Sequence, residues 1–362
     1  MTRTPAILRN LDTKGLRLDY NRLAEELSIA EYALGLLEGS QKKLQNPELL
    51  ISPLTAKEAA TSSKIEGTQS DVADVFRFEA GIETKHADTR EVVNYRSAMR
   101  LAMREIGKGR IVSTHLIEAL HEVLLKDVRH RGVPGKFREG RVWIGERIGD
   151  PIEKAIYIPP EPFHVKSLID NLFDYINSGK ENALIKAGIV HYQFEAIHPF
   201  DDGNGRIGRL LIPLILYKHQ RLSSPILYLS GYFNEHRDEY IARLHAVDEG
   251  VVIEEWLKFF LRSVAEQLNQ TQKIIGEIYS LYDEMRREVA GIKSPYIIPF
   301  IDMLFMYPIF TIKMVQDHTK CSSYLTAVTL IRNMQKREYI NEIGKKVRNK
   351  LFSFAPLLQI IE

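Results

Sequence analysis

The chain has 362 residues, which is too long for one ordinary hydrophobic core, so we expect two or three domains. Its 44% hydrophobic and 27% charged residues are typical of a globular protein and exclude a disordered one. The net charge of +2 does not favour nucleic acid or a membrane as the main partner, and the only cysteine, Cys321, excludes a disulfide framework and a multi-cysteine zinc site.

Neither a secretory signal nor a membrane span is predicted. The first residues lack the apolar core that a signal peptide needs, and no run of about 18 apolar residues occurs. We therefore expect a soluble, cytoplasmic protein.

Helical periodicity covers most of the chain. Residues 16–37 have the apolar spacing of one long amphipathic helix. A second helical stretch opens at Ser52 and ends at Gly67, because glycine favours helix termination. Further helices are expected over 91–106, over 113–128 with Ser113 as the N-cap, and from 165 to 285.

Two short β-rich runs, 141–145 and 155–159, are separated by a polar turn and predict a hairpin. Beyond a hinge expected at 291–295, the C-terminal segment has the pattern of three helices followed by two strands. These elements are expected at 296–306, 311–318, 322–336, 339–343 and 350–354. Their order resembles a winged helix-turn-helix.

The most informative segment is His198-Pro-Phe-Asp-Asp-Gly-Asn-Gly-Arg-Ile-Gly-Arg209, here called the signature segment. Its glycines, Gly203, Gly205 and Gly208, allow positive φ and close approach of the backbone to a ligand. Successive N–H groups before a helix form an anion-binding nest. Together with a histidine, an acid, an amide and two arginines, they predict a polyphosphate site beside a base.

Two common glycine loops do not fit this segment. It lacks the lysine and hydroxyl residue of a P-loop. Residues 183–194, which precede it, are predicted as a helix, whereas a dinucleotide-binding loop follows a strand. A surface loop whose glycines and aspartates merely make turns remains the alternative.

The signature segment resembles, at every defined position, the HxFx(D/E)GNGRxxR pattern of Fic proteins, which transfer AMP from ATP to hydroxyl side chains of proteins. The resemblance implies a mainly α fold, a Fic-type helical bundle with a β-hairpin flap, followed here by the winged helix-turn-helix domain. We expect an N-terminal helical domain over 1–90, a Fic catalytic core over 91–290 and a winged-helix-like domain over 291–362.

By this resemblance His198 is the catalytic base, because an imidazole can accept a hydroxyl proton at neutral pH. Asp202 is expected to hold Mg²⁺ or Mn²⁺, since Mg²⁺ takes one or two carboxylates together with phosphate oxygens. The resemblance assigns Arg206 to the α- and β-phosphates and Arg209 to the γ-phosphate. The expected ATP-binding residues are Gly203, Asn204, Gly205, Arg206, Ile207, Gly208, Arg209 and Tyr240. Phe200 is expected to anchor the loop and Asp201 to lie in a turn.

The first β-rich run resembles the Fic flap, which covers the nucleotide and aligns the target by strand addition. Its residues are Val142, Trp143, Ile144 and Gly145; an ordinary hairpin covering the core is the alternative. The Trp143 ring can pack inward while the strand edge stays available. Tyr240 matches an aromatic residue that lines adenine, whereas Ile241 and Asp248 depart from the usual Tyr and Asn.

Residues Ser62-Ser-Lys-Ile-Glu66-Gly67 fit the (S/T)xxxE(G/N) pattern of the Fic inhibitory helix. By resemblance, Glu66 pairs with Arg209 and takes the place of the γ-phosphate. We therefore expect an enzyme that its own N-terminal helix inhibits. The alternatives are a solvated glutamate before a capping glycine, and a glutamate that positions water for removing AMP.

In the C-terminal segment, residues 322–336 would be a recognition helix. Basic residues near it and on the wing could contact DNA phosphates, and they are Arg332, Lys336, Arg337, Lys345, Lys346 and Arg348. Dimerisation or docking of a target protein fits this segment equally well.

The sequence as a whole predicts a protein adenylyltransferase that uses ATP and Mg²⁺ on an unknown target protein, with the chain itself as a further candidate substrate. DNA and a second copy of the chain are candidate partners. The runner-up is a DNA-binding regulator that senses a nucleotide. Removal of AMP and transfer of phosphoryl, phosphocholine or uridylyl groups are the alternatives within the enzyme class.

Overall fold

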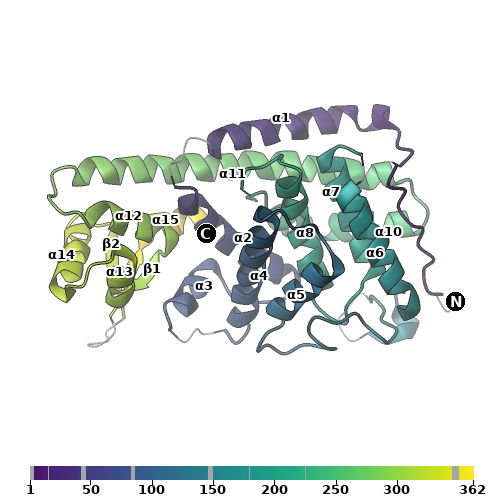
Figure 1. Ribbon diagram of the computed structural model, residues 1–362, viewed down its shortest axis with the longest axis horizontal. Helices are drawn as coiled ribbons and strands as arrows, with labels where there is room; N and C mark the ends of the chain where they lie inside the picture. The colour runs from purple at the N-terminus through teal and green to yellow at the C-terminus, as the bar shows by residue number, and fades with distance from the viewer. Residues whose placement is uncertain are drawn as a thin grey trace. The chain divides into compact units, whose positions relative to one another are not determined.

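A computed structural model describes residues 4–14, 16–41, 46–82, 86–145, 150–178, 180–224, 226–344 and 350–362 (Figure 1). The chain forms two compact units. Unit 1 comprises Met1–Glu38 and Asn94–Leu268, and unit 2 comprises Gly39–Val93 and Asn269–Glu362. Helices α1 (Ala24–Gln41), α4 (Thr89–Gly107) and α11 (Ile253–Val289) contribute residues to both units. The division into three domains stays a prediction.

Unit 1 is built around α7 (Ala183–Ile197) and α8 (Asn204–Lys218), which pack against each other. Most of their residues are buried, which is expected of helices that are apolar on all sides. The other helical elements of unit 1 are η1 (Tyr20–Arg22), α5 (Thr114–Leu124), η2 (Ile152–Lys154), α6 (Pro162–Ser178), α9 (Ser230–Glu235) and α10 (Arg237–Asp248).

Helix α7 approaches α11 closely at Gly188. A Cβ atom at this glycine would lie 2.8 Å from Cδ2 of Leu257 and 2.9 Å from Cδ1 of Phe260. The Gly188 carbonyl also accepts a hydrogen bond of 2.9 Å from the indole N–H of Trp256. These contacts fix α7, the helix that leads into the signature segment.

Unit 2 combines helices with a small sheet. Its elements are α2 (Glu48–Ile65), α3 (Val72–Glu79), α12 (Ile297–Met306), β1 (Ile309–Thr311), α13 (Ile312–Thr319), α14 (Tyr324–Gln335), β2 (Ile340–Ile343), β3 (Leu351–Phe354) and α15 (Ala355–Ile361). The strands are antiparallel in the order β1-β3-β2, with Phe310 opposite Phe352. Phe305 and Phe354 meet edge to face at 5.2 Å in the core of this unit.

The predicted mainly α fold is confirmed. In the C-terminal segment the predicted helices and strands correspond to α12, α13, α14, β2 and β3, while β1 and α15 were not predicted. The identity of this segment as a winged helix-turn-helix stays a prediction. Lys345, Lys346 and Arg348 lie outside the described residues.

Three predicted helix boundaries are wrong. Residues 16–19 are not helical, because the Asp19 side chain accepts the Asn21 N–H and opens a short 3-10 helix there. Helix α2 begins at Glu48, before Ser52, and contains Pro53 within its length. Ser113 caps α5 as predicted, but this helix ends at Leu124, four residues short of the predicted 128. Among the described residues, no helix is both long and apolar enough to cross a membrane.

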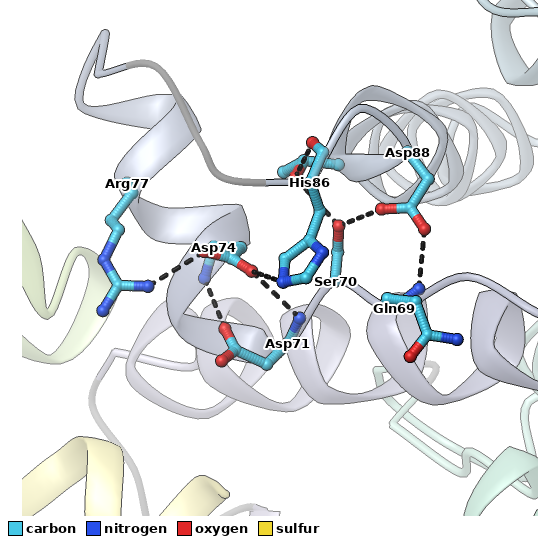
Figure 2. A network of polar contacts seen from close by, with 8 residues as sticks. Gln69, Ser70, Asp71, Asp74, Arg77, His86 and Asp88 are labelled. Carbon is cyan, nitrogen blue, oxygen red and sulfur yellow. Dashed lines mark hydrogen bonds and ion pairs between the residues drawn. The ribbon is translucent and has the colours of Figure 1, made fainter.

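The end of α2 is fastened to the start of α4 by the Asp88 clasp, which consists of Gln69, Ser70 and Asp88 (Figure 2). The Asp88 carboxylate accepts the Gln69 N–H at 2.6 Å and the Ser70 hydroxyl. The Ser70 hydroxyl also lies 2.8 Å from the Thr89 hydroxyl. The segment that follows α2 is therefore tied to the N-terminus of α4.

A second set of polar contacts in Figure 2 lies at the N-terminus of α3. Asp71 is the N-cap of this helix and forms a capping box with Asp74. The Asp74 carboxylate also pairs with Arg77 at 2.9 Å and lies 3.8 Å from the imidazole of His86. Carboxylates therefore hold the turn between α2 and α3 at two places: Asp88 binds Gln69 and Ser70, and Asp71 and Asp74 cap α3.

We expect Asp88→Ala to loosen the end of α2. The variant loses two hydrogen bonds to a charged acceptor and should cost about 1–3 kcal/mol of local stability. Hydrogen exchange followed by mass spectrometry should show faster exchange at Gln69, with no change in Glu277→Ala, which removes an exposed carboxylate from α11. Unchanged exchange at Gln69 would contradict the assigned clasp.

Candidate active site

The signature segment forms a tight connection between α7 and α8. His198 is the C-cap of α7, with a left-handed φ of 48°, and its N–H donates to the Phe194 carbonyl at 3.0 Å. Gly203 is the N-cap of α8, with a φ of 77°. Gly205 and Gly208 lie within α8 without a positive φ, so the expected left-handed backbone occurs at Gly203 alone among the three glycines.

Asn204 closes the loop by bonding to the backbone of Phe200. Its Oδ1 accepts the Phe200 N–H at 2.9 Å, and its Nδ2 donates to the Phe200 carbonyl at 2.8 Å. Both ends of the amide are used in this way, and Asn204 is buried. Asn204 therefore orients the loop, and a contact with ATP stays a prediction.

Two arginines lie at the start of α8, almost fully buried. Arg206 and Arg209 are 4% and 3% exposed. Nη2 of Arg206 lies 3.2 Å from Oδ1 of Asp202, whose side chain is 33% exposed. Burying a cation is costly unless a negative group compensates it. Guanidinium groups at the positive end of a helix have the charge and the donors to bind a polyanionic ligand, and this role for Arg206 and Arg209 stays a prediction.

Asp202 is suited to a cation that arrives with its ligand. Within the described ranges, no group of three or more His, Cys, Asp and Glu residues could hold a metal ion. Mg²⁺, however, commonly takes one or two carboxylates and completes its shell with phosphate oxygens and water. The half-buried carboxylate of Asp202, 3.2 Å from Arg206, fits this pattern.

His121 of α5 packs against the loop, a contact that was not predicted from the sequence. Its ring stacks on Phe200 at 3.7 Å with an interplanar angle of 6°. Nδ1 accepts the Gly135 N–H at 2.9 Å, so the proton is on Nε2, which donates to the Asp202 carbonyl at 3.0 Å. Burial lowers the pKa of His121 to about 4. The neutral ring thus holds both Phe200 and Asp202.

The flap is shorter than predicted. Among the described residues, the two runs 141–145 and 155–159 pair through a single antiparallel bridge, between Ile144 and Tyr157. The Ile144 N–H donates to the Tyr157 carbonyl at 2.9 Å. The Trp143 ring does not pack inward, because it is 41% exposed and its indole N–H donates to the Asp150 carbonyl. Val142 and Gly145 are partly exposed beside it, and residues 146–149 are not described.

Tyr240 belongs to an aromatic cluster that also contacts α7. Its hydroxyl lies 2.8 Å from Nε2 of His191, and its ring stacks on Phe233 at 4.4 Å. Burial lowers the pKa of His191 to about 3. Tyr240 is only 4% exposed, so its hydroxyl serves this cluster, and a contact with adenine stays a prediction.

His191 links this cluster to the signature segment. A Cβ atom at Gly208 would lie 3.3 Å from Nδ1 of His191 and 2.4 Å from Oε1 of Glu195. Any side chain at position 208 would therefore clash with side chains of α7. Tyr240 is thus connected through one histidine to α8, although it lies 31 residues beyond Arg209 in the chain.

The structure brings His198, Asp202, Arg206 and Arg209 together in one loop and one helix turn of unit 1. Glu66 belongs to unit 2, where it is the C-cap of α2. Gly67 follows with a φ of 100°, as expected of a glycine that ends a helix. The pairing of Glu66 with Arg209 stays a prediction.

Comparison with known families gives two matches. Residues 24–104 match the model described as "Fic/DOC family N-terminal", and residues 111–216 match the model described as "Fic/DOC family". The second match contains the flap residues and the entire signature segment.

Curated relatives carry the name protein adenylyltransferase. A protein of Aquifex aeolicus, named "Probable protein adenylyltransferase", is 27% identical over 247 residues, covering 66% of this chain and 69% of that protein. "Protein adenylyltransferase fic-1" of Caenorhabditis briggsae is 31% identical over 170 residues, covering 43% of this chain and 29% of that protein. The chain therefore spans less than a third of this animal relative.

Solved structures show the same fold. A Fic family protein from Desulfovibrio desulfuricans is 17% identical, with a TM-score of 0.60, and the match covers 94% of this chain and 98% of that one. Fic-1 of Caenorhabditis elegans is 21% identical, with a TM-score of 0.54, over 72% of this chain and 75% of that one.

We expect the stability of unit 1 to fall as the pH is lowered from 7 towards 4. The pKa of His121 is lowered from 6.5 to about 4, so the unfolded chain binds this proton first. The contribution of His121 to the free energy of unfolding is therefore fully present above pH 6.5 and is lost as the pH falls from 6.5 towards 4. His191 acts in the same direction.

Urea unfolding followed by tryptophan fluorescence is the measurement, because both tryptophans, Trp143 and Trp256, lie in unit 1. His121→Phe keeps a ring against Phe200 but cannot titrate. It should be less stable at pH 7 and should lose less stability on acidification. A pH dependence equal to that of the unaltered chain would show that His121 is not the titrating group.

Proposed function

The chain belongs to the Fic/DOC family, and we propose that it is a protein adenylyltransferase, which moves AMP from ATP to a hydroxyl side chain of a protein. The observation that carries the proposal is the pair of buried arginines in the first turns of α8, the helix that follows the His198 loop. The names of the curated relatives support the same reaction.

In the proposed reaction, His198 takes the proton of the target hydroxyl. The hydroxyl oxygen forms a bond to the α-phosphorus of ATP, and the bond between that phosphorus and the oxygen bridging to the β-phosphate breaks. Pyrophosphate leaves, and AMP remains joined to the protein. Arg206 and Arg209 are proposed to bind the phosphates, since their fork-shaped donors match phosphate oxygens.

Asp202 is proposed to hold Mg²⁺, which would neutralise charge on the phosphates when bound. The backbone N–H groups of Gly203 and of the first residues of α8, including Gly205, Ile207 and Gly208, would bind the phosphates at close range. Tyr240 is proposed to shape the adenine side, and residues 142–145 to receive the target segment along a strand edge.

We expect purified protein incubated with α-labelled ATP and Mg²⁺ to become covalently labelled. His198→Ala should lose the label, because the variant lacks the proposed base, while His115→Ala, an exposed histidine of α5, should keep it. Chelation of divalent cations should also abolish labelling. Equal labelling of the His198→Ala variant would refute the proposed base.

We also propose that Glu66 inhibits the enzyme from the end of α2. Its carboxylate would pair with Arg209 and displace the γ-phosphate, which spoils the alignment that the reaction needs. The Asp88 clasp supports this proposal, because it fixes the segment that follows Glu66.

Glu66→Gly should raise auto-labelling by about tenfold or more, since alignment carries much of the rate. Glu66→Gln, which keeps the shape without the charge, should act in the same direction. Lys64→Gly weakens the same helix end without removing a carboxylate and should leave labelling unchanged. If Lys64→Gly activates as strongly as Glu66→Gly, the effect belongs to the helix end and not to the carboxylate.

A further inference from the structure

Arg138 is a buried arginine that the sequence did not single out. It lies in the connection that follows α5 and is 3% exposed. Burial lowers its pKa, while the carboxylates of Asp201 and Glu161 oppose that shift. The guanidinium stays charged in any case, because an arginine does not lose its proton in a protein. Such a cation is costly to bury, so the contacts that it makes are informative.

The hydrogen bonds of the Arg138 guanidinium go to backbone carbonyls from two different places. On one side, Nε donates to the His198 carbonyl at 2.8 Å, and Nη2 lies 3.4 Å from the Ile197 carbonyl. On the other side, Nη1 donates to the Gly140 carbonyl at 3.1 Å, and Nη2 donates to the Pro160 carbonyl at 2.5 Å.

The first pair of carbonyls ends α7. The last carbonyls of a helix have no partner within the helix and carry its partial negative charge. A guanidinium placed there satisfies them and is itself stabilised. The Arg138 backbone N–H adds a bond of 2.9 Å to the Pro199 carbonyl. These bonds hold the turn in which His198 has its positive φ, a conformation that costs energy outside glycine.

The second pair of carbonyls brackets the flap. Gly140 directly precedes the first run of the flap, 141–145, and Pro160 directly follows the second run, 155–159. Within the described residues, the backbone hydrogen bonds between the two runs all involve Ile144, which pairs with Ile156 and Tyr157, so the runs have little pairing of their own. The ends of the flap are therefore positioned by the same group that holds the His198 turn.

We infer that Arg138 is a positioning residue that holds the flap and His198 in fixed relation, so that a target hydroxyl on the flap meets the base. The inference rests on the proposed adenylyl transfer. Lysine cannot replace it, because one ammonium group cannot reach four carbonyls that a planar fork reaches together.

The test uses the full-length chain carrying Glu66→Gly, with auto-labelling by α-labelled ATP measured at increasing ATP concentration. Arg138→Lys and Arg138→Met should lower the maximal rate by about tenfold or more, because small displacements of reacting groups are that costly. The ATP concentration for half-maximal rate should stay within about twofold, since Arg138 touches no residue proposed to bind phosphate. Hydrogen exchange should become faster both in the two flap runs, 141–145 and 155–159, and at 197–198.

Lys186→Met is the matched control, because Lys186 is a buried cation of α7, the helix whose last carbonyls Arg138 contacts; Lys186 is 1% exposed and its ammonium lies beside His219. It should change neither the maximal rate per folded molecule nor exchange in the flap. The inference is overturned if Lys186→Met lowers the rate as much as Arg138→Lys does. It is also overturned if only one of the two segments exchanges faster, or if the half-maximal ATP concentration rises while the maximal rate is kept.

Failure of the inference is distinguishable from failure of the proposed function. If the chain with Arg138 intact is never labelled, adenylyl transfer is wrong. Exchange in the two segments still reports whether Arg138 links them, because that measurement needs no reaction.

Discussion

The contact between the Arg138 guanidinium and the carbonyls at the end of α7 is the interaction on which the candidate site depends. Helix α7 must stop at His198 with a positive φ, and the chain must turn at once into α8. Four carbonyls from the His198 turn and the flap meet one planar cation there. Asn204 and His121 then fix the loop from within and from below. Hydrogen bonds from side chains to the loop backbone thus hold the candidate site, and they restrict the movement of the loop residues.

The same region concentrates buried positive charge. Arg138, Arg206 and Arg209 are each less than 5% exposed, and α8 adds the positive end of its dipole. The Arg138 cation donates its hydrogen bonds to the carbonyls around the loop. The arginines of α8 are proposed to bind a polyphosphate, whereas Arg138 is proposed to hold the backbone of the site in place.

The signature segment was predictable because its chemistry is local. Twelve consecutive residues carry the base, the acid, the glycines and the arginines, and helical periodicity placed α7 and α8 on either side. The contacts of Arg138 and His121 were not predictable, since Arg138 donates to carbonyls 59 and 60 residues away and His121 donates to the Asp202 carbonyl 81 residues away. Strand β1 was missed for a related reason, because three residues form a strand only when β3 is beside them. The need for glycine at position 208 is explained by packing, because a side chain there would overlap Glu195 and His191 of α7.

The chemical identity of the transferred group tests the account most directly. Intact-mass and peptide mass spectrometry of the Glu66→Gly chain, after incubation with ATP and Mg²⁺, should find an added AMP on a Ser, Thr or Tyr hydroxyl, and no addition when His198 is also replaced. An added phosphate in place of AMP, or an addition that survives the loss of His198, would contradict adenylyl transfer by this loop.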